Sequence, residues 1–248
     1  MKKGQRLDVA LVERGLAASR ERARALILAG QVRVDGHPVT KAGAPVAAGA
    51  ALRVETPDHP YVGRGGVKLA HAIERFGVRV EGRTALDVGA ATGGFTDVLL
   101  RCGAKRVVAL DVGHGQIDWK LRTDPRVIVL EGVNARTLSP DRLPAGTTAF
   151  DLVTIDVAFI SLRQILPVLP PLLVAGADVI LLVKPQFEAG RGEVGRGGIV
   201  RDEAVQARVV ADVSGAAEAL GFVPAGMVES PITGMEGNRE FFLHVRQP

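Results

Sequence analysis

The feature that most constrains the fold of this chain is a glycine-rich turn between a predicted strand and a predicted helix. A short apolar run at 84–86 predicts a buried strand. It leads through the segment 87–95, which contains three glycines, into a helical pattern at 96–102. A strand, a glycine turn and a helix form the first unit of nucleotide-type binding folds. Glycine lets the backbone approach a ligand closely, and the helix N-terminus supplies free N–H groups. We therefore expect an α/β domain with a ligand site at this turn, called here the glycine loop (residues 87–95).

The composition of the glycine loop indicates which ligand it holds. Its spacing departs from the dinucleotide fingerprint, because three other residues separate Gly89 from the pair Gly93 and Gly94. The acid at the strand end, Asp87, suits a cationic or amine-bearing ligand better than a pyrophosphate. We interpret the loop as a site for S-adenosylmethionine, with an ordinary glycine-rich turn as the alternative. The residues expected to bind the cofactor here are Asp87, Gly89, Ala90, Gly93, Gly94 and Phe95.

Acidic or amide side chains also follow the next predicted strands. Asp111 ends a strand at 105–111, close to the spacing of about 20 residues at which an acid binds the ribose hydroxyls of a nucleotide cofactor. Asn134 follows a third strand and is placed to meet an adenine edge, although asparagine is also a common turn former. Asp156 ends a fourth strand, and we expect it at the same edge of the sheet, beside the cofactor.

The fifth predicted strand places a lysine at this edge as well. The run at 177–183 is apolar enough for a central strand, and Lys184 follows it directly. Burial favours the uncharged form of a lysine, so we expect the pKa of Lys184 to be lowered. An uncharged lysine can accept a proton in a reaction.

The remaining pattern completes an α/β sheet. The segment 160–174 is helical in pattern, with a kink expected at Pro167 and a break at Pro170 and Pro171, and another helix is expected at 201–220. Strands at 222–228 and 241–245 predict a closing hairpin whose last strand inserts antiparallel. The expected fold class is α/β, a Rossmann-like class I methyltransferase sheet with an antiparallel last strand, preceded by a small α+β domain.

The first sixty residues predict that small domain. Helices are expected at 6–14 and 20–29, the second capped by Ser19, followed by a hairpin at 31–39 and a strand at 51–55. This stretch holds ten basic and six acidic residues, a surplus of four that equals the net charge of the whole chain. Such a cluster can bind phosphates, and a solvated basic face is the alternative.

Composition excludes several other classes of protein. Cys102 is the single cysteine in 248 residues, which excludes a disulfide framework and a thiolate metal cluster, and no metal is expected. No apolar run reaches the length of a membrane span, and the N-terminus lacks the core of a signal peptide. We therefore expect a cytoplasmic protein without membrane contacts. The oligomeric state stays open, with a monomer as one option.

Three segments of the N-terminal stretch resemble a known RNA-binding domain. The segments 6–8, 19–23 and 30–36, in this order, are similar to the domain named after protein S-four of the small ribosomal subunit. This resemblance implies contacts to structured RNA through the second helix and the loop after it. The residues expected to bind RNA are Arg6, Arg20, Arg22, Arg24, Arg33 and Arg64.

Four residues scattered through the rest of the chain carry a second resemblance. They are Lys68, Asp156, Lys184 and Glu240, each at the end of a core element near one sheet edge, and they resemble the Lys-Asp-Lys-Glu tetrad of ribose 2′-O-methyltransferases. The resemblance implies that Lys184 acts as general base, with its pKa lowered by burial and by Lys68. Asp156 and Glu240 would then orient the two lysines. A structural salt-bridge network is the alternative.

The motifs around these residues narrow the resemblance to one family. The segments 64–69, 87–95, 156–162, 183–188 and 237–240 are similar to those of the TlyA/hemolysin-A family, which combines an S-four-type domain with an FtsJ-like methyltransferase domain. The resemblance implies S-adenosylmethionine-dependent 2′-O-methylation of ribosomal RNA within ribosomal subunits, with cytidine as target. One departure is Ala158, where the family pattern has serine.

The sequence also supports a division into domains and leaves other functions open. The expected division is an RNA-binding domain at 1–58, a proline-containing linker at 59–65 and a methyltransferase domain at 66–248. The alternatives are an RNA-binding or ribosome-assembly factor with a non-catalytic methyltransferase scaffold, and a haemolysin-type protein. A small-molecule methyltransferase is disfavoured, because it would not need a basic front domain.

Overall fold

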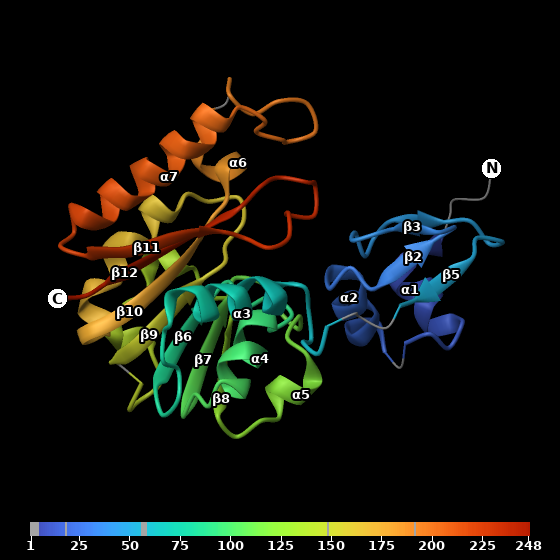
Figure 1. The fold of residues 1–248 in the computed structure, drawn as a ribbon. Coiled ribbons are helices and arrows are strands. Elements are labelled where there is room, and N and C mark those ends of the chain that lie inside the picture. The colour runs from blue at the N-terminus through green and yellow to red at the C-terminus, as the bar shows by residue number, and fades with distance from the viewer. Residues whose placement is uncertain (1–4, 18, 56–58, 148, 191) are drawn as a thin grey trace.

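The computed structural model describes residues 5–17, 19–55, 59–147, 149–190 and 192–248 of the chain. It shows a small N-terminal part beside a larger part built on one sheet (Figure 1). The linker residues between β5 and α3 fall partly outside the described residues, and so does the expected domain end at residue 58. No helix among the described ranges combines the length and apolar character needed to cross a membrane.

Two helices and three short strands form the body of the N-terminal part. Its elements are β1 (Gln5–Arg6), α1 (Leu7–Glu13), α2 (Arg20–Leu28), β2 (Val32–Val34), β3 (His37–Pro38), β4 (Pro45–Val46) and β5 (Leu52–Val54). Strands β3, β2 and β5 form an antiparallel sheet, and β1 pairs with β4. The two helices pack on a small core that includes Leu7, Leu11, Ile27 and Val32. The expected α+β arrangement is therefore confirmed.

Local sequence explains two boundaries in this part. Ser19 caps α2 by accepting a hydrogen bond from the backbone N–H of Arg22, as expected for a serine at this position. The β2–β3 hairpin turns at Asp35 and Gly36, which both have positive φ. A two-residue turn of this kind requires positive φ at both positions, and aspartate followed by glycine is a preferred pair there.

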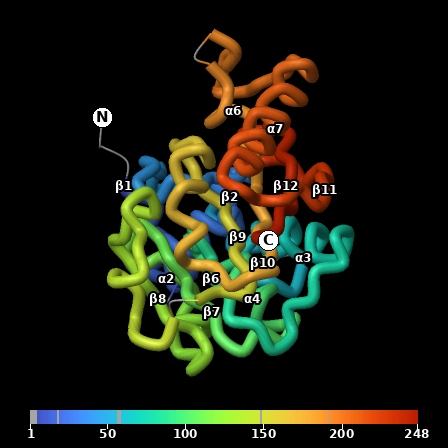
Figure 2. The backbone as a smooth tube through the Cα atoms, turned by 90° about the vertical axis from the view of Figure 1, so that its left-hand side faces the viewer, coloured from blue at the N-terminus to red at the C-terminus, as the bar shows by residue number. Residues whose placement is uncertain are grey.

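The larger part is a seven-stranded sheet with helices on both faces. The strand order is β11-β12-β10-β9-β6-β7-β8, with the five strands from β10 to β8 parallel and β12 antiparallel to both its neighbours. Figure 2 follows this sheet from β8 at one edge to β11 at the other. The expected insertion of the last strand is confirmed. The elements are α3 (Gly65–Phe76), β6 (Thr84–Val88), α4 (Gly94–Arg101), β7 (Arg106–Asp111), α5 (Trp119–Arg122), β8 (Val127–Glu131), β9 (Phe150–Ile155), β10 (Leu173–Val183), α6 (Pro185–Glu188), α7 (Glu203–Glu218), β11 (Val223–Glu229) and β12 (Phe241–Arg246).

Alternating side chains of the central strands fill two separate cores. In β10, Val179, Leu181 and Val183 belong to the core under α7, whereas Ile180 and Leu182 belong to the core under α3 and α4. Successive side chains of a strand point to opposite faces, so a strand covered on both faces must be apolar throughout. This covering holds the carboxyl ends of the parallel strands in one fixed edge.

The segment 160–174 is not the single helix that its pattern predicts. It forms three short 3₁₀ turns (Leu162–Gln164, Leu166–Val168 and Pro170–Leu172), and its last two residues belong to β10. Proline lacks the N–H that a helix interior needs and clashes with the preceding turn, and this short segment contains three prolines. The apolar side chains still reach the core. The pattern therefore predicted correctly that these residues are buried, but it predicted the wrong backbone conformation.

Candidate active site

The glycine loop lies directly against the residues that follow β9. Gly89 has a φ of +83°, and a Cβ at this position would lie 2.1 Å from the carbonyl oxygen of Asp156. The N–H of Asp156 in turn donates to the carbonyl oxygen of Val88 at 2.9 Å. Only glycine fits so close a backbone approach. The glycine loop therefore places the backbone of Gly89, which carries no side chain, directly beside Asp156, the first of the predicted catalytic carboxylates.

A large cavity opens at this edge of the sheet. Its volume is about 910 Å³, and it is lined by parts of the glycine loop, the ends of β7 and β9, and residues from α2 and the loop after β3 in the N-terminal part. Of the residues expected to bind the cofactor, the lining includes Gly89, Ala90, Gly94, Phe95, Asp111, Asn134 and Asp156. A site of this size at the carboxyl ends of parallel strands is where α/β proteins bind nucleotide-type ligands.

Asp87 and Gly93 are not among the residues that line this cavity. The carboxylate of Asp87 is fully buried beneath the loop, where it accepts hydrogen bonds from Oγ1 of Thr96 at 2.6 Å and Oγ1 of Thr154 at 3.1 Å. Burial raises the pKa of Asp87 to about 7, against the lowering effect of the two threonine hydroxyls. Asp87 thus ties β6, α4 and β9 together under the site, rather than facing the expected ligand directly.

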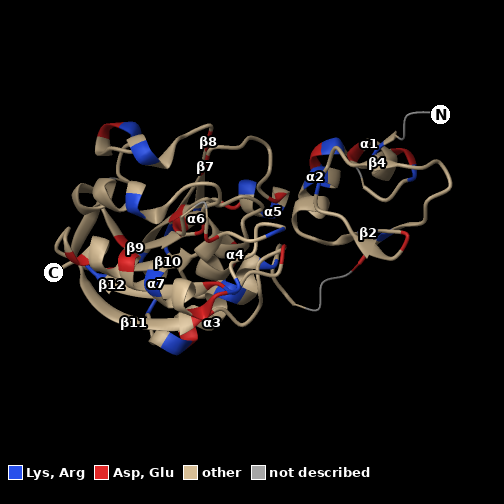
Figure 3. Cartoon of the chain, turned by 90° about the horizontal axis from the view of Figure 1, so that it is seen from above, with Lys and Arg blue, Asp and Glu red and all other residues tan. Residues whose placement is uncertain are grey.

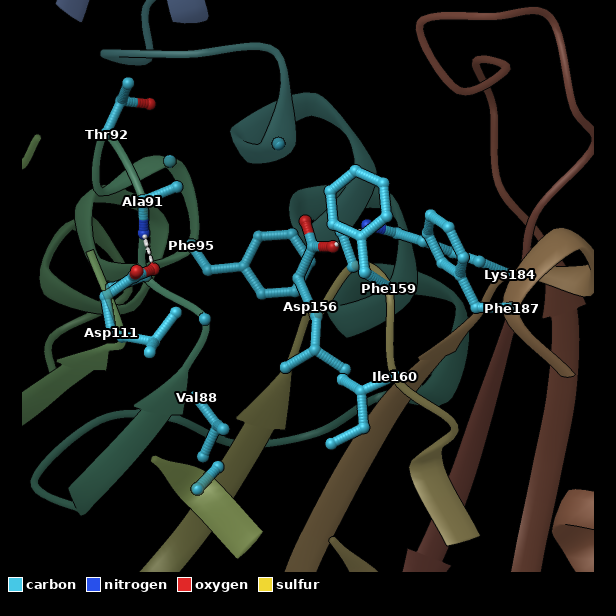
Figure 4. Close-up of a pocket in the computed structure, with 18 of the residues that line it drawn as sticks. Val88, Ala91, Thr92, Phe95, Asp111, Asp156, Phe159, Ile160, Lys184 and Phe187 are labelled. Atoms are coloured by element: carbon cyan, nitrogen blue, oxygen red, sulfur yellow. Dashed lines mark hydrogen bonds and ion pairs between the residues drawn. The ribbon is translucent and has the colours of Figure 1, made fainter. Parts of the chain in front are cut away.

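Asp111 and Asn134 stand on the wall of the cavity that the glycine loop forms. Figure 4 shows the carboxylate of Asp111 accepting from the backbone N–H of Ala91, at 2.8 Å, and its other oxygen accepts from the N–H of Gly113 at 2.7 Å. Oδ1 of Asn134 accepts from the N–H of Arg136 at 3.0 Å. Both side chains are therefore held in the cavity lining by backbone contacts.

The four residues of the expected tetrad come together as two ion pairs on one side of the cavity. Nζ of Lys68 lies 2.5 Å from Oε2 of Glu240, and Nζ of Lys184 lies 2.5 Å from Oδ1 of Asp156. The first pair is also a hydrogen bond, whereas the second is ionic, because Oδ1 of Asp156 has no aligned hydrogen-bond donor. All four side chains are at least half buried and line the cavity.

The expected lowering of the pKa of Lys184 is wrong for this structure. Burial does lower the pKa, but the negative charges of Asp156 and Glu240 outweigh it, and the pKa lies above the ordinary 10.5. Burial and a second lysine both favour the uncharged form and are the effects that the sequence suggests. The two carboxylates stand close enough to hold the ammonium form, and their charge decides the direction.

An exposed phenylalanine at the mouth of the cavity escaped the sequence analysis. The ring of Phe159 is 92% exposed, its backbone has a φ of +65°, and it lies 5.2 Å from the ring of Phe187 between centroids. Figure 4 shows the two rings beside one another, with the Lys184 side chain drawn in the same part of the cavity. Phe159 lies three residues after the acid at the end of a predicted strand, and this position is the one signal that the sequence offered. The exposure of the ring and the positive φ of Phe159 could not be derived from the sequence.

Three of the arginines expected to bind RNA surround one buried carboxylate. Arg6 donates two hydrogen bonds of 2.9 Å to Asp8, and Arg20 and Arg24 approach the same carboxylate at 3.3 Å. The Arg6 guanidinium holds the pKa of Asp8 well below its usual range. Each arginine remains about half exposed, so three cations from β1 and α2 surround one anion and leave a local surplus of positive charge. Figure 3 shows basic residues on α2.

The other three arginines have different surroundings. Arg22 forms an ion pair with Asp118, which connects the N-terminal part to α5 of the larger part. Arg33 pairs with Glu55 at 2.5 Å within the small sheet. Arg64 lines the cavity and donates to a backbone carbonyl oxygen at 3.4 Å. The six arginines therefore do not form one surface.

This arrangement is suited to moving a proton beside a bound nucleotide-type ligand. Two lysines and two carboxylates hold fixed positions within a partly buried cavity, where their charges act more strongly than in water. Figure 4 shows Ala91, Thr92 and Asp111 on one side of that cavity and Lys184 on the other, with Asp156 between them. A hydroxyl group that entered from solvent would meet a lysine and an exposed aromatic ring.

Comparisons with known proteins agree with both parts of the chain. The family described as FtsJ-like methyltransferase matches residues 61–247, and the S4 domain matches residues 5–52. The chain is 49% identical over 247 residues to 16S/23S rRNA (cytidine-2′-O)-methyltransferase TlyA of Mycobacterium tuberculosis, an alignment that covers 99% of this chain and 91% of that protein. It is 39% identical to hemolysin A of Brachyspira hyodysenteriae, over 96% of this chain and 98% of that one.

A solved structure also resembles the whole chain. A protein from Streptococcus thermophilus that carries the name hemolysin has a TM-score of 0.76 and 42% identity, over 100% of this chain and 90% of its own. Both the order and the extent of the two parts are therefore shared with relatives along almost the full length.

Proposed function

Because this chain belongs to the TlyA/hemolysin-A family, with an S4 domain and an FtsJ-like methyltransferase domain, we propose that it methylates ribosomal RNA. The reaction transfers the methyl group of S-adenosylmethionine to a ribose 2′-hydroxyl, with cytidine as the target that the relative's name suggests. The observation that carries this proposal is the meeting of the Lys68–Glu240 and Lys184–Asp156 pairs in the cavity beside the glycine loop.

The size of the cavity and the groups that line it support S-adenosylmethionine as the ligand. Asp111 would accept from ribose hydroxyls, Asn134 would meet the adenine edge, and Gly89 lets the glycine loop pack closely on the backbone of Asp156. The bound cofactor supplies a methyl group on a sulfonium, which is already a good leaving group. What remains for the protein is to align the hydroxyl and to take up its proton.

Lys184 and Asp156 would perform that alignment. The ammonium of Lys184 is held by Asp156, so the lysine has a fixed position from which it can contact the 2′-oxygen. After release of its proton to solvent, Lys184 would accept the proton of the hydroxyl as general base. The Lys68–Glu240 pair stands beside this site and, through the charge of Glu240, contributes to holding the Lys184 ammonium.

The N-terminal part and Phe159 would bind the RNA. Half-exposed Arg6, Arg20 and Arg24 can contact phosphates, while the exposed ring of Phe159 offers a face on which an unpaired base can stack. We divide the chain into an RNA-binding domain at 1–58, a linker at 59–65 and a methyltransferase domain at 66–248. A ribosomal substrate places the reaction in the cytoplasm.

Transfer of labelled methyl groups to purified ribosomal subunits tests this proposal. The wild-type protein should label ribosomal RNA when it is given labelled S-adenosylmethionine, and K184A should lose at least about a hundredfold in rate. Cofactor affinity of K184A, measured by calorimetry, should stay within about threefold of wild type. Binding of subunits without methyl transfer would instead support an assembly factor with a non-catalytic scaffold.

A further inference from the structure

A buried carboxylate that the proposed mechanism does not use lies at the end of α6. The side chain of Glu188 is 2% exposed, and Glu188 lies four residues after Lys184 in the sequence. Its two oxygens accept hydrogen bonds of 2.6 Å, one from Oγ of Ser161 and one from the backbone N–H of Leu162. Arg163 approaches it at 3.6 Å from a half-exposed position.

The partners of Glu188 belong to the segment that carries the other member of the ion pair. Asp156 directly follows β9, and the chain then runs through residues 156–162, called here the β9 loop, to Ser161 and Leu162. Lys184 directly follows β10 and precedes α6, whose last residue is Glu188. The β9 loop and the segment 184–188 therefore each contribute one member of the ion pair and one side of the Glu188 contact.

A second contact joins the same two segments. The rings of Phe159 and Phe187 lie 5.2 Å apart, and Phe159 holds a φ of +65° that a bulky side chain rarely adopts. Such a backbone conformation is unfavourable and persists only where neighbouring contacts hold it. The hydrogen bonds of Glu188 lie two and three residues beyond this strained position, where they can supply that support.

We propose that Glu188 is a positioning residue, which holds the β9 loop against α6 and thereby fixes the Asp156 carboxylate beside the Lys184 ammonium. This role rests on the proposed function, because it assigns Glu188 to the geometry of the methyl-transfer site. Glu188 itself touches neither the expected substrate nor the expected cofactor.

The chemistry of the contact requires a side chain with two acceptors. A carboxylate accepts from both donors at once, whereas an amide offers one acceptor and one donor. In E188Q, the carbonyl oxygen can keep the Leu162 N–H, and the Ser161 hydroxyl can rotate to accept from the amide. In E188A, both hydrogen bonds disappear and the Leu162 N–H is left buried without a partner, which removes the restraint on the β9 loop.

Kinetics of four variants test this role. We expect E188A to lower kcat for ribosomal RNA methylation by about 30- to 100-fold, since misplacement by about 1 Å can cost a hundredfold. KM for RNA and Kd for S-adenosylmethionine should stay within about threefold. E188Q should recover most of the rate, and S161A, which removes one bond, should fall between wild type and E188A. The matched control is E193A, which removes an exposed carboxylate that pairs with Arg208 away from the β9 loop.

A second measurement reads the position of Asp156 without any turnover. The rate at which acetic anhydride acetylates Lys184, followed by mass spectrometry against pH, gives the pKa of that lysine. The charged groups facing Lys184 are Asp156 and Glu240, with Lys68 beyond Glu240. If Asp156 moves away in E188A, the raised pKa of Lys184 should fall toward its ordinary value. E193A should leave it unchanged.

The two readouts separate the inference from the proposed function. Wild-type protein that methylates no ribosomal RNA would overturn the function, and the Lys184 titration would then decide the inference alone. An active, folded E188A with unchanged kcat or an unchanged Lys184 pKa would overturn the inference. The inference would also be overturned if the lower kcat of E188A followed a lower Tm while the pKa of Lys184 stayed constant. If E188A does not fold, S161A becomes the test. The pKa of Lys184 should then fall in S161A, by less than is expected for E188A. An unchanged Lys184 pKa in S161A would overturn the inference.

Discussion

At the scale of single residues, neighbouring charges decide the chemistry of the site more than burial does. Lys184 is buried and yet keeps a raised pKa, because Asp156 and Glu240 both favour its charged form. Burial and the negative charge of Asp156 raise the pKa of Asp87 as well, and for an acid this favours the neutral form. The two groups therefore differ in charge at neutral pH although both shifts have the same direction.

The raised pKa of Lys184 predicts the pH dependence of the reaction. A general base must be uncharged, and below its pKa the uncharged fraction grows tenfold for each pH unit. We therefore expect kcat at saturating substrates to rise with a slope of about one log unit per pH unit between about pH 6 and 9. The measurement is single-turnover methyl transfer across that range. A flat or falling profile would remove Lys184 as the base.

The buried carboxyl group of Asp87 predicts that the protein loses stability as the pH rises. A carboxylate in an ordinary ion pair has the opposite effect, because its stabilising contribution is lost as the pH falls. Its pKa in the folded protein, about 7, is above the 3.8 expected of the unfolded chain, so folding favours the protonated form. The stabilising contribution is complete below about pH 4 and is lost as the pH rises to about 7. At about 1.4 kcal/mol per pKa unit, the loss is on the order of 4 kcal/mol at most.

Urea unfolding of wild type and D87N at pH 5 and pH 8 measures this contribution. D87N carries no titrating group at this position and keeps an acceptor for one threonine hydroxyl. Its free energy of unfolding should therefore fall less between the two pH values than that of wild type. Equal falls in both proteins would show that Asp87 does not titrate in this range.

At the scale of elements, the site depends on how closely the glycine loop approaches the end of β9. Gly89 combines a positive φ with a backbone contact that a Cβ would occupy. We expect G89A to displace the loop and to weaken S-adenosylmethionine binding by at least tenfold, as measured by calorimetry. G77A is the matched control, because Gly77 also has a positive φ at the end of α3 but has open space around it. Equal losses of affinity in both variants would assign the effect to backbone strain alone.

The strands of the sheet could be predicted from sequence, but the segment between β9 and β10 could not. Apolar runs ending in Asp87, Asp111 and Asp156 located the parallel strands, because buried strands are apolar throughout. The same logic placed Lys184 at the sheet edge. The 3₁₀ turns at 162–172 share apolar spacing with a helix, and only their prolines mark the difference. Contacts between distant segments, such as that of Glu188 with Ser161, leave no local pattern.

At the scale of the whole molecule, a basic part and a methyl-transfer part meet at one cavity. Residues of α2 line that cavity together with the glycine loop, and the Arg22–Asp118 pair joins the two parts. RNA held by the N-terminal part would therefore lie beside the tetrad.

The salt dependence of RNA binding tests this division of labour. R20Q combined with R24Q keeps the two hydrogen bonds between Arg6 and Asp8 but removes two half-exposed cations. The slope of log affinity against log salt concentration should become shallower by about 1.4 to 1.8, because each RNA phosphate that the variant no longer neutralises contributes roughly 0.7–0.9. Cofactor affinity should not change. R208Q, on the exposed face of α7, is the control, and a similar change there would show that the effect is not specific to α2.

The central claim is that a ribose oxygen of ribosomal RNA receives the methyl group at the Lys184 site. The most direct measurement is mass-spectrometric mapping of 2′-O-methylated nucleotides in subunits treated with wild type or K184A. We predict one or a few wild-type-dependent positions that resist alkaline cleavage and are absent with K184A. Methyl groups on bases alone, or the same ribose positions with K184A, would contradict the account.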